Sequence, residues 1–273
     1  MKRLAWLTDV HLNFLEDVDR RQFAESLAGE SFDAVVISGD IAESPDVCEH
    51  LREMADVVRR PVYFVLGNHD FYRGSIERTR REVTELAAGS EFLDYLTASE
   101  VVELTPTTAL VGHDGWGDAR LGDYDGSDVL LNDFFYIEEL KRYQTGPWEI
   151  DRASLEGMLR SLGSEAARHF ARVLPEAFET NRQVVAVTHV PPFREAAWHK
   201  GKHSDDDWLP FFASKAAGDC MRDVMRDRPD RELVVLCGHT HGAGQTQILD
   251  NLRVLTGGAD YGRPRIEEIL AFE

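Results

Sequence analysis

Short apolar runs rich in β-branched residues recur along the chain between longer helical patterns, and this alternation constrains the fold most. Runs of four or five such residues are too short for helices and are typical of buried strands. We predict six such strands, at Leu4–Leu7, Ala34–Ile37, Val62–Leu66, Val184–Val187, Leu233–Leu236 and Leu252–Leu255. Strands that alternate with helices favour sheets covered by helices, and so an α/β fold.

Three segments between these strands carry apolar residues at helical spacing. The first, from Val47 to Val58, follows Ser44 and Pro45, which we expect to be the N-cap and the first helical residue. The second runs from Ile76 to Leu86, and the third and longest from Leu155 to Val173. We expect these helices to cover the faces of the sheet.

The chain has 273 residues, of which 43% are hydrophobic, which fits one domain spanning residues 1–273. Two stretches, 119–150 and 191–217, follow neither the strand nor the helix pattern. We predict that they are loop or cap insertions over one face, because long loops in compact domains often lie beside the functional site. Surface decoration is an equally open reading of both stretches.

The charge balance and the N-terminal residues bear on partners and location. A formal net charge of −19 repels polyanions and argues against general nucleic-acid binding. The N-terminus reaches Asp9 before any long apolar stretch, so we expect neither a signal peptide nor a membrane span. We therefore expect the protein to be cytoplasmic. Cys48, Cys220 and Cys237 form no C-x-x-C pair, which argues against a thiolate zinc site.

Five of the predicted strands end in side chains that can bind metals. These side chains are Asp9 and His11, Asp40, Asn68 with His69 and Asp70, His189, and His239 with His241. A lone D-x-H or G-D is common, whereas Gly-Asn-His-Asp and Gly-His-Thr-His after buried strands are far more specific. Ligands gather at the carboxyl ends of strands in open α/β sheets, so the pattern predicts a metal site there.

The ordered motifs D-x-H, G-D, G-N-H-D, H and G-H-T-H resemble those of the calcineurin-like metallophosphoesterase family, and they span Asp9 to His241. The resemblance implies a two-sheet β-sandwich flanked by helices, with two metal ions (manganese, iron or zinc) at the strand ends. One metal would be bound by Asp9, His11 and His241, the other by Asn68, His189 and His239. Asp40 would bridge them.

The resemblance also implies a reaction. A hydroxide that bridges the metals would attack the phosphorus of a phosphate ester. His69 matches the family histidine that protonates the departing oxygen, so we expect it to be the general acid. Its alternative role is to hold a neighbouring group by a hydrogen bond.

Two positions help to place the chain within the family. Glu43 stands where protein serine/threonine phosphatases carry Asp-Arg-Gly and purple acid phosphatases a tyrosine ligand. His69 stands where lipid-A precursor pyrophosphohydrolases usually have arginine. What remains resembles the bacterial phosphodiesterase branch, with small phosphodiesters or phosphomonoesters as substrates. The roles of Glu43, His113 and the 199–203 loop stay open.

Two other functions compete with a small-molecule esterase. A nuclease would share these motifs, but the acidity of the chain argues against it. A non-catalytic scaffold of the same fold would lose catalytic residues, and none is lost here. Sequence leaves the substrate, the metal identity and the oligomeric state undetermined.

Overall fold

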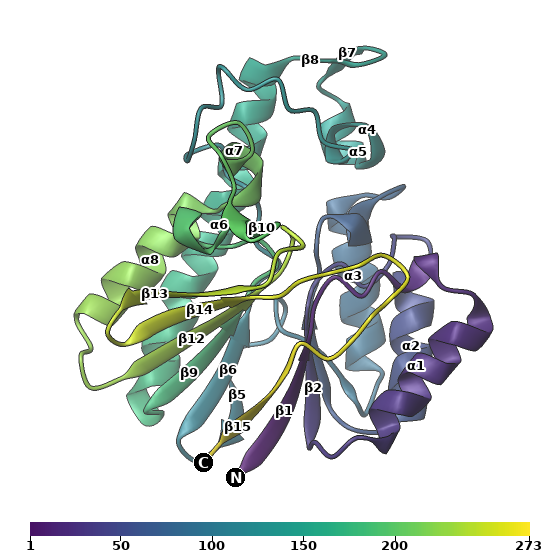
Figure 1. The fold of residues 1–273 in the computed structure, drawn as a ribbon, viewed down its shortest axis with the longest axis vertical. Coiled ribbons are helices and arrows are strands. Elements are labelled where there is room, and N and C mark those ends of the chain that lie inside the picture. The colour runs from purple at the N-terminus through teal and green to yellow at the C-terminus, as the bar shows by residue number, and fades with distance from the viewer.

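The computed structural model describes all residues, 1–273, and contains two large sheets packed face to face (Figure 1). The first sheet has the order β15-β1-β2-β3-β4. Its strands are β1 (Lys2–Leu7), β2 (Ala34–Ser38), β3 (Val62–Val65), β4 (Leu93–Tyr95) and β15 (Glu268–Phe272). The strands β1 to β4 run parallel, and only β15 is antiparallel to its neighbour.

The second sheet has the order β13-β14-β12-β9-β6-β5. Its strands are β5 (Val102–Thr105), β6 (Thr108–Gly112), β9 (Gln183–Val187), β12 (Glu232–Cys237), β13 (Gly244–Leu249) and β14 (Leu252–Thr256). Its four central strands are parallel, and an antiparallel strand closes each edge. All six predicted strands are therefore present.

Alternation along each strand builds three large hydrophobic cores. Leu4 and Trp6 of β1 point between the sheets, where they meet Val234 and Leu236 of β12 in a shared core. The next residue, Ala5, faces the opposite way into the core beneath the first helix layer. Since successive strand residues point to opposite faces, a strand buried on both sides reads as a continuous apolar run.

Helices cover the outer face of each sheet, as Figure 1 shows. The first sheet is covered by α1 (Asp17–Gly29), α2 (Val47–Val58) and α3 (Ile76–Ala88), and the second by α6 (Arg152–Thr180) and α8 (Lys215–Arg226). The architecture is that of a two-sheet sandwich flanked by helices, which confirms the expected fold class. None of these helices is both long and apolar enough to span a membrane.

The predicted start of α2 is wrong by two residues. The helix begins at Val47, with Asp46 at the N-cap position, so Ser44 and Pro45 lie in the turn before it. The Ser44 hydroxyl shares a hydrogen bond of 2.7 Å with the Thr79 hydroxyl instead of capping the helix. A tertiary contact has replaced the local cap that the sequence suggested.

The two stretches that follow no simple pattern, 119–150 and 191–217, lie at one end of the sandwich (Figure 1). We refer to them together as the cap. Their short elements are α4 (Asp133–Tyr136), α5 (Glu138–Lys141), β7 (Gln144–Gly146), β8 (Glu149–Ile150), β10 (Trp198–His199), β11 (Lys202–His203) and α7 (Leu209–Phe212). Phe134 and Phe211 anchor the cap in the core that also holds the first half of α6.

Candidate metal centre

The ends of five parallel strands bring the seven predicted ligands together. Asp9 and His11 follow β1, Asp40 follows β2 and Asn68 follows β3, three adjacent strands of the first sheet. His189 follows β9, and His239 and His241 follow β12, adjacent strands of the second sheet. Because both sheets present their carboxyl ends to the same side, the loops meet between the sheets and beneath the cap.

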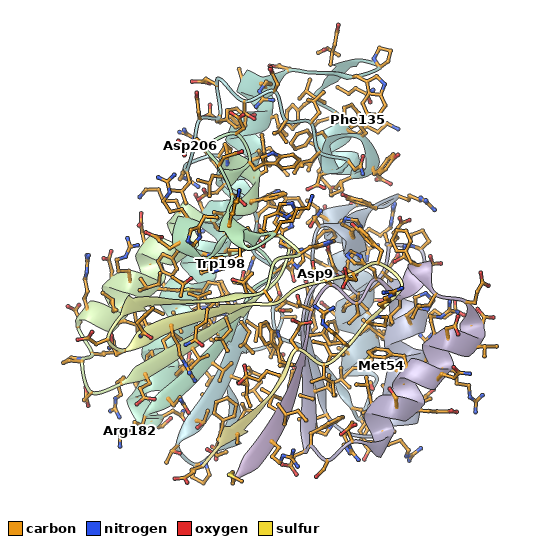
Figure 2. The ribbon with its side chains drawn as sticks, viewed as in Figure 1. Asp9, Met54, Phe135, Arg182, Trp198 and Asp206 are labelled. Atoms are coloured by element: carbon orange, nitrogen blue, oxygen red, sulfur yellow. The ribbon has the colours of Figure 1, made fainter.

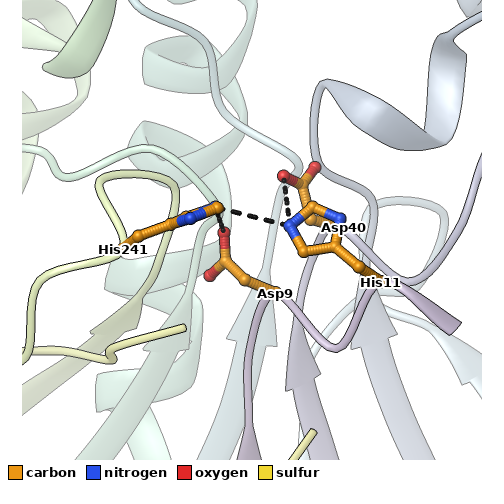
Figure 3. A group of neighbouring side chains, drawn as sticks. All are labelled: Asp9, His11, Asp40 and His241. Atoms are coloured by element: carbon orange, nitrogen blue, oxygen red, sulfur yellow. Dashed lines mark hydrogen bonds and ion pairs between the residues drawn. The ribbon is translucent and has the colours of Figure 1, made fainter. Parts of the chain in front are cut away.

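One group contains Asp9, His11, Asp40 and His241, drawn in Figure 3. One ligand atom from each residue lies within 4.8 Å of the others. His241 Nε2 is 3.4 Å from Asp9 Oδ1 and 3.3 Å from His11 Nε2, and His11 Nε2 is 3.7 Å from Asp40 Oδ2. Two imidazoles and two carboxylates that converge at these distances offer the nitrogen and oxygen ligands that one divalent cation requires.

A second group contains Asn68, His189 and His239, together with the other oxygen of Asp40. Asn68 Oδ1 is 3.1 Å from His189 Nε2 and 2.9 Å from His239 Nδ1. His189 Nε2 is also 3.3 Å from Asp40 Oδ1. Asp40 therefore directs Oδ2 toward the first group and Oδ1 toward the second, the placement that a bridging carboxylate requires.

The protonation of the ring nitrogens fits bound cations. His239 Nε2 donates to the Phe211 carbonyl at 3.2 Å, and burial, with the nearby His189 charge, lowers the pKa of His239 to about 3. The ring is therefore neutral, and its bare Nδ1 faces the Asn68 carbonyl oxygen, an acceptor facing an acceptor. A cation that binds both atoms would remove this repulsion.

The surroundings of His189 also favour a positive charge at its Nε2. Its Nδ1 donates to the Ser38 carbonyl at 2.9 Å, so that Nε2 points at Asn68 and Asp40. Burial lowers the pKa of His189, but the Asp40 and Asp9 carboxylates and the Ser38 carbonyl together outweigh it and raise the pKa to about 10. A metal ion would take the place of this proton on Nε2.

The backbone at the site is held in an unusual conformation. Five of the seven predicted ligands have positive φ: Asp9 (47°), His11 (42°), Asp40 (54°), His239 (70°) and His241 (55°). Residues other than glycine adopt this region rarely, and such strain gathers where function over-determines the structure. The fold thus tolerates local backbone strain, and these five side chains converge on one point.

Two glycines permit the close approach of the ligand loops. A Cβ on Gly67 would lie 2.2 Å from Asp40 Oδ1, and one on Gly238 would lie 2.0 Å from Asp9 Oδ2. These contacts are impossible for any other residue without displacing the carboxylate. The glycines in the G-N-H-D and G-H-T-H motifs are therefore required by packing against ligands, not only by turn geometry.

The orientation of Asn68 depends on two residues that sequence reasoning missed. Its amide nitrogen donates to Asp133 Oδ1 at 2.9 Å, and the Tyr72 hydroxyl donates to the same oxygen at 2.6 Å. Asp133 is buried and belongs to α4 of the cap. Because the nitrogen is committed to this carboxylate, Oδ1 of Asn68 is the atom that faces the histidines.

A cavity of about 230 Å³ opens over the two groups. His69 lines it and stacks on Tyr72 with 4.3 Å between ring centroids, while neither nitrogen of its ring has a hydrogen-bond partner in the protein. Tyr261, from the loop after β14, packs against His11 with 4.6 Å between centroids and lines the same cavity. No local pattern marks Tyr261 in the sequence.

Of the residues with open roles, His199 of the 199–203 loop lines this cavity, whereas Glu43 and His113 have partners elsewhere. Glu43 Oε2 forms an ion pair with Arg73 at 3.1 Å and forms neither a hydrogen bond nor an ion pair with the ring of His69. His113 is buried, and its Nδ1 accepts from the Gly115 amide at 3.1 Å, so it stabilises the turn after β6. Asp70 accepts from the amides of Ile41 and Gly67 at 2.9 and 2.8 Å, and so fastens two ligand loops together.

Two packed sheets with a histidine-carboxylate-amide cluster at their shared carboxyl end define a class of metal-dependent hydrolases. The family model described as calcineurin-like phosphoesterase matches residues 2–243, and the chain belongs to this family. It is a metal-dependent phosphoesterase, as the sequence predicted. The chain matches no curated protein sequence.

Two solved structures share the fold. A phosphopantetheinyl hydrolase from Mycobacterium tuberculosis superposes with a TM-score of 0.61 at 16% identity, covering 93% of this chain and 89% of that one. A dimetal phosphatase from Danio rerio superposes with a TM-score of 0.56 at 15% identity, covering 94% of this chain and 87% of that one. At these identities the likeness extends to the fold alone.

Proposed function

We propose that this chain hydrolyses small organic phosphate esters, diesters or monoesters, at a centre of two metal ions. The observation that carries the proposal is the placement of Asp40, whose two oxygens face two separate ligand groups. We assign Asp9, His11 and His241 to one ion and Asn68, His189 and His239 to the other. Manganese, iron and zinc all suit this mixture of imidazole, carboxylate and amide ligands.

The protein would position the predicted metal ligands and would supply a proton donor beside the reacting phosphate. Bound divalent cations would supply a water that is acidic at neutral pH and would neutralise charge on the phosphoryl oxygens. Asp9 is held for this purpose by the Thr8 hydroxyl at 2.6 Å and by the His239 amide at 3.1 Å. His69, whose ring nitrogens are free, is placed to give a proton to the departing oxygen.

The cap supports a preference for small substrates. Leu131, Asn132 and Asp133 of its first stretch and His199 and Phe212 of its second line the cavity above the ligands. We propose that residues 1–273 act as one domain in which the cap restricts access. A polymer would have to pass beneath both stretches to place a phosphodiester at the ligands.

A metal and substrate screen tests the proposal. The purified protein is analysed for metal content, reloaded with manganese, iron or zinc, and assayed for phosphate release from monoesters, diesters and cyclic diesters. We expect about two ions per chain and turnover of at least one small ester. Rapid cleavage of duplex DNA at moderate salt, without turnover of small esters, would contradict the proposal and favour a nuclease.

A further inference from the structure

A hairpin of the cap lies beside the candidate metal centre and carries two exposed lysines. It consists of β10 and β11 joined by Lys200 and Gly201, and it reads His-Lys-Gly-Lys-His from residue 199 to residue 203. Lys200 and Lys202 are exposed, and neither forms an ion pair. The chain has a net charge of −19, so a run of five residues that contains two unpaired lysines, two histidines and no acidic residue is unusual in it.

The hairpin is fixed to the loop that carries two predicted ligands. His199 Nδ1 donates to the carbonyl of Thr240, which stands between His239 and His241, at 2.9 Å. Trp198 Nε1 donates to the Thr246 hydroxyl at 3.1 Å. Figure 2 shows Trp198 at the same end of the sheets as Asp9.

Two glycines after the G-H-T-H motif allow the hairpin to pack closely against this segment. A Cβ on Gly242 would lie 2.3 Å from the Trp198 carbonyl oxygen, and one on Gly244 would lie 2.4 Å from the Trp198 ring. The hairpin therefore packs directly against the backbone that follows His241. The backbone that carries the two lysines is therefore held at a set place relative to the candidate metal centre.

A second cavity, of about 440 Å³, runs along the hairpin and adjoins the one above the ligands. Both cavities are lined by His199 and Phe212, and we refer to the two adjoining cavities together as the cleft. Phe212 packs against His239 with 4.9 Å between ring centroids, and Trp208 packs against Phe212 at 5.0 Å. An apolar wall thus leads from the metal centre to the lysines.

The second cavity contains one acidic residue, Asp205. Its carboxylate accepts from the Trp208 amide at 3.2 Å, at the start of α7. Neither Lys200 nor Lys202 forms an ion pair with Asp205 or any other carboxylate, so both are available to an anion.

We propose that this hairpin binds a second phosphate group of the substrate, so that the physiological substrate class is a small organic bisphosphate. One phosphate ester would be cleaved at the metal centre, the organic part would lie along Phe212 and Trp208, and Lys200 and Lys202 would bind the other phosphate. The inference rests on the proposed function, because it names the substrate class of that same site.

The test compares alkanediol bisphosphates of increasing chain length with alkyl monophosphates of the same length, using manganese-loaded protein. At the chain length that spans the cleft, we expect kcat/KM for the bisphosphate to exceed that for the monophosphate by about 10-fold, the effect of a charged hydrogen bond. A K200Q/K202Q variant should lose this preference, and a K200R/K202R variant should keep it.

Lys141 and Arg142 give a matched control. They are adjacent, exposed cations at the end of α5 and line neither cavity, so K141Q/R142Q removes the same charge elsewhere in the cap. We expect this variant to keep the preference for the bisphosphate. If the K141Q/R142Q and K200Q/K202Q variants lose it equally, the effect is one of net charge and the proposed subsite is wrong.

Calorimetry separates failure of the subsite from failure of the proposed function. If the wild-type protein hydrolyses neither ester, the proposed function fails, and binding of non-hydrolysable alkane diphosphonates still tests the hairpin. Tighter binding of the diphosphonate than of the monophosphonate, lost in K200Q/K202Q, supports the subsite. Equal binding of both ligands, or a preference that survives in K200Q/K202Q, overturns it.

Discussion

The amide nitrogen of Asn68 donates a hydrogen bond to Asp133, a buried carboxylate that lies 65 residues away in the cap. The same carboxylate accepts from Tyr72, which in turn packs against His69. The cap therefore does more than cover the site, because it sets which atom of Asn68, a predicted ligand, faces His189 and His239. Groups that orient metal ligands in this way commonly change metal affinity when they are removed.

We therefore expect Asp133→Ala to weaken binding of one metal ion by about 10- to 100-fold. Asp133→Asn should have a smaller effect, since its amide oxygen still accepts from Asn68. Calorimetric titration of the metal-free protein with manganese measures the metal affinity without requiring turnover.

Asp125 provides the control for this experiment, because it is an exposed carboxylate in the same stretch of the cap. Asp125→Ala should bind metal as the wild-type protein does. Unchanged affinity at both sites in Asp133→Ala would mean that Asn68 holds its orientation without the cap.

Replacement of Asp40 should be more damaging than replacement of His11. Asp40 faces both ligand groups, whereas His11 faces only one. We expect Asp40→Ala to lose both ions and measurable turnover, while His11→Ala keeps one ion. Metal content per chain, measured by mass spectrometry after dialysis, distinguishes the two variants. Full activity of Asp40→Ala at saturating metal would rule out a bridging role.

The fold and the predicted ligands could be read from the sequence because their signals are local. His239 and His241 follow a buried apolar run at a spacing of two residues and lie between glycines, a pattern contained in one short segment. Parallel strand order then brings such ends together without further information. The family match confirms the expected class, and the assignment of individual ligands stays a prediction.

The features that could not be predicted from the sequence depend on packing between residues far apart in the chain. Asp133 follows no strand, and Tyr261 lies in an irregular loop, so neither stands in a recognisable pattern. The expected N-cap at Ser44 failed for the same reason, because its hydroxyl bonds to Thr79 of another helix. Side chains recruited across the fold become visible only when the fold places them.

We expect a histidine outside the candidate metal centre to make the stability of the protein depend on pH. His169 of α6 has a buried Nε2 without a hydrogen-bond partner, and its ring lies 5.1 Å from that of His113. Burial, with a smaller contribution from His113, lowers the pKa of His169 from 6.5 to about 4. Since the folded pKa lies below the unfolded one, this contribution to stability is complete above pH 6.5 and is lost as the pH falls toward 4.

Urea unfolding at pH 7 and pH 5 measures this effect. We expect the wild-type protein to lose about 1 kcal/mol more unfolding free energy between these two pH values than His169→Gln, after allowance for solvent screening. The comparison cancels titration of the predicted ligands, which both proteins share. His203→Gln, at an exposed position, should behave as the wild type does; an equal pH dependence in His169→Gln would contradict the assignment.

The role of His69 as a proton donor can be tested through the leaving group. An alkoxide needs a proton as the P–O bond breaks, whereas a nitrophenolate is stable enough to leave without one. His69 lines the cavity above the ligands, and its ring nitrogens are free of protein partners, so its side chain is available to the departing oxygen. In His69→Ala we expect turnover of alkyl esters to fall by about 10²- to 10⁴-fold, and turnover of nitrophenyl esters to fall much less.

The comparison uses one variant protein with two substrates, so any shared damage to folding or metal affinity cancels. It requires single turnovers in which the chemical step is rate-limiting. The His69 amide donates to Asp40 Oδ1 at 2.9 Å through the backbone, and this bond survives the substitution. A selective loss for alkyl esters would therefore report on the imidazole alone. Equal losses for both esters would show that His69 acts through electrostatics or by positioning a neighbour, and not by donating the proton.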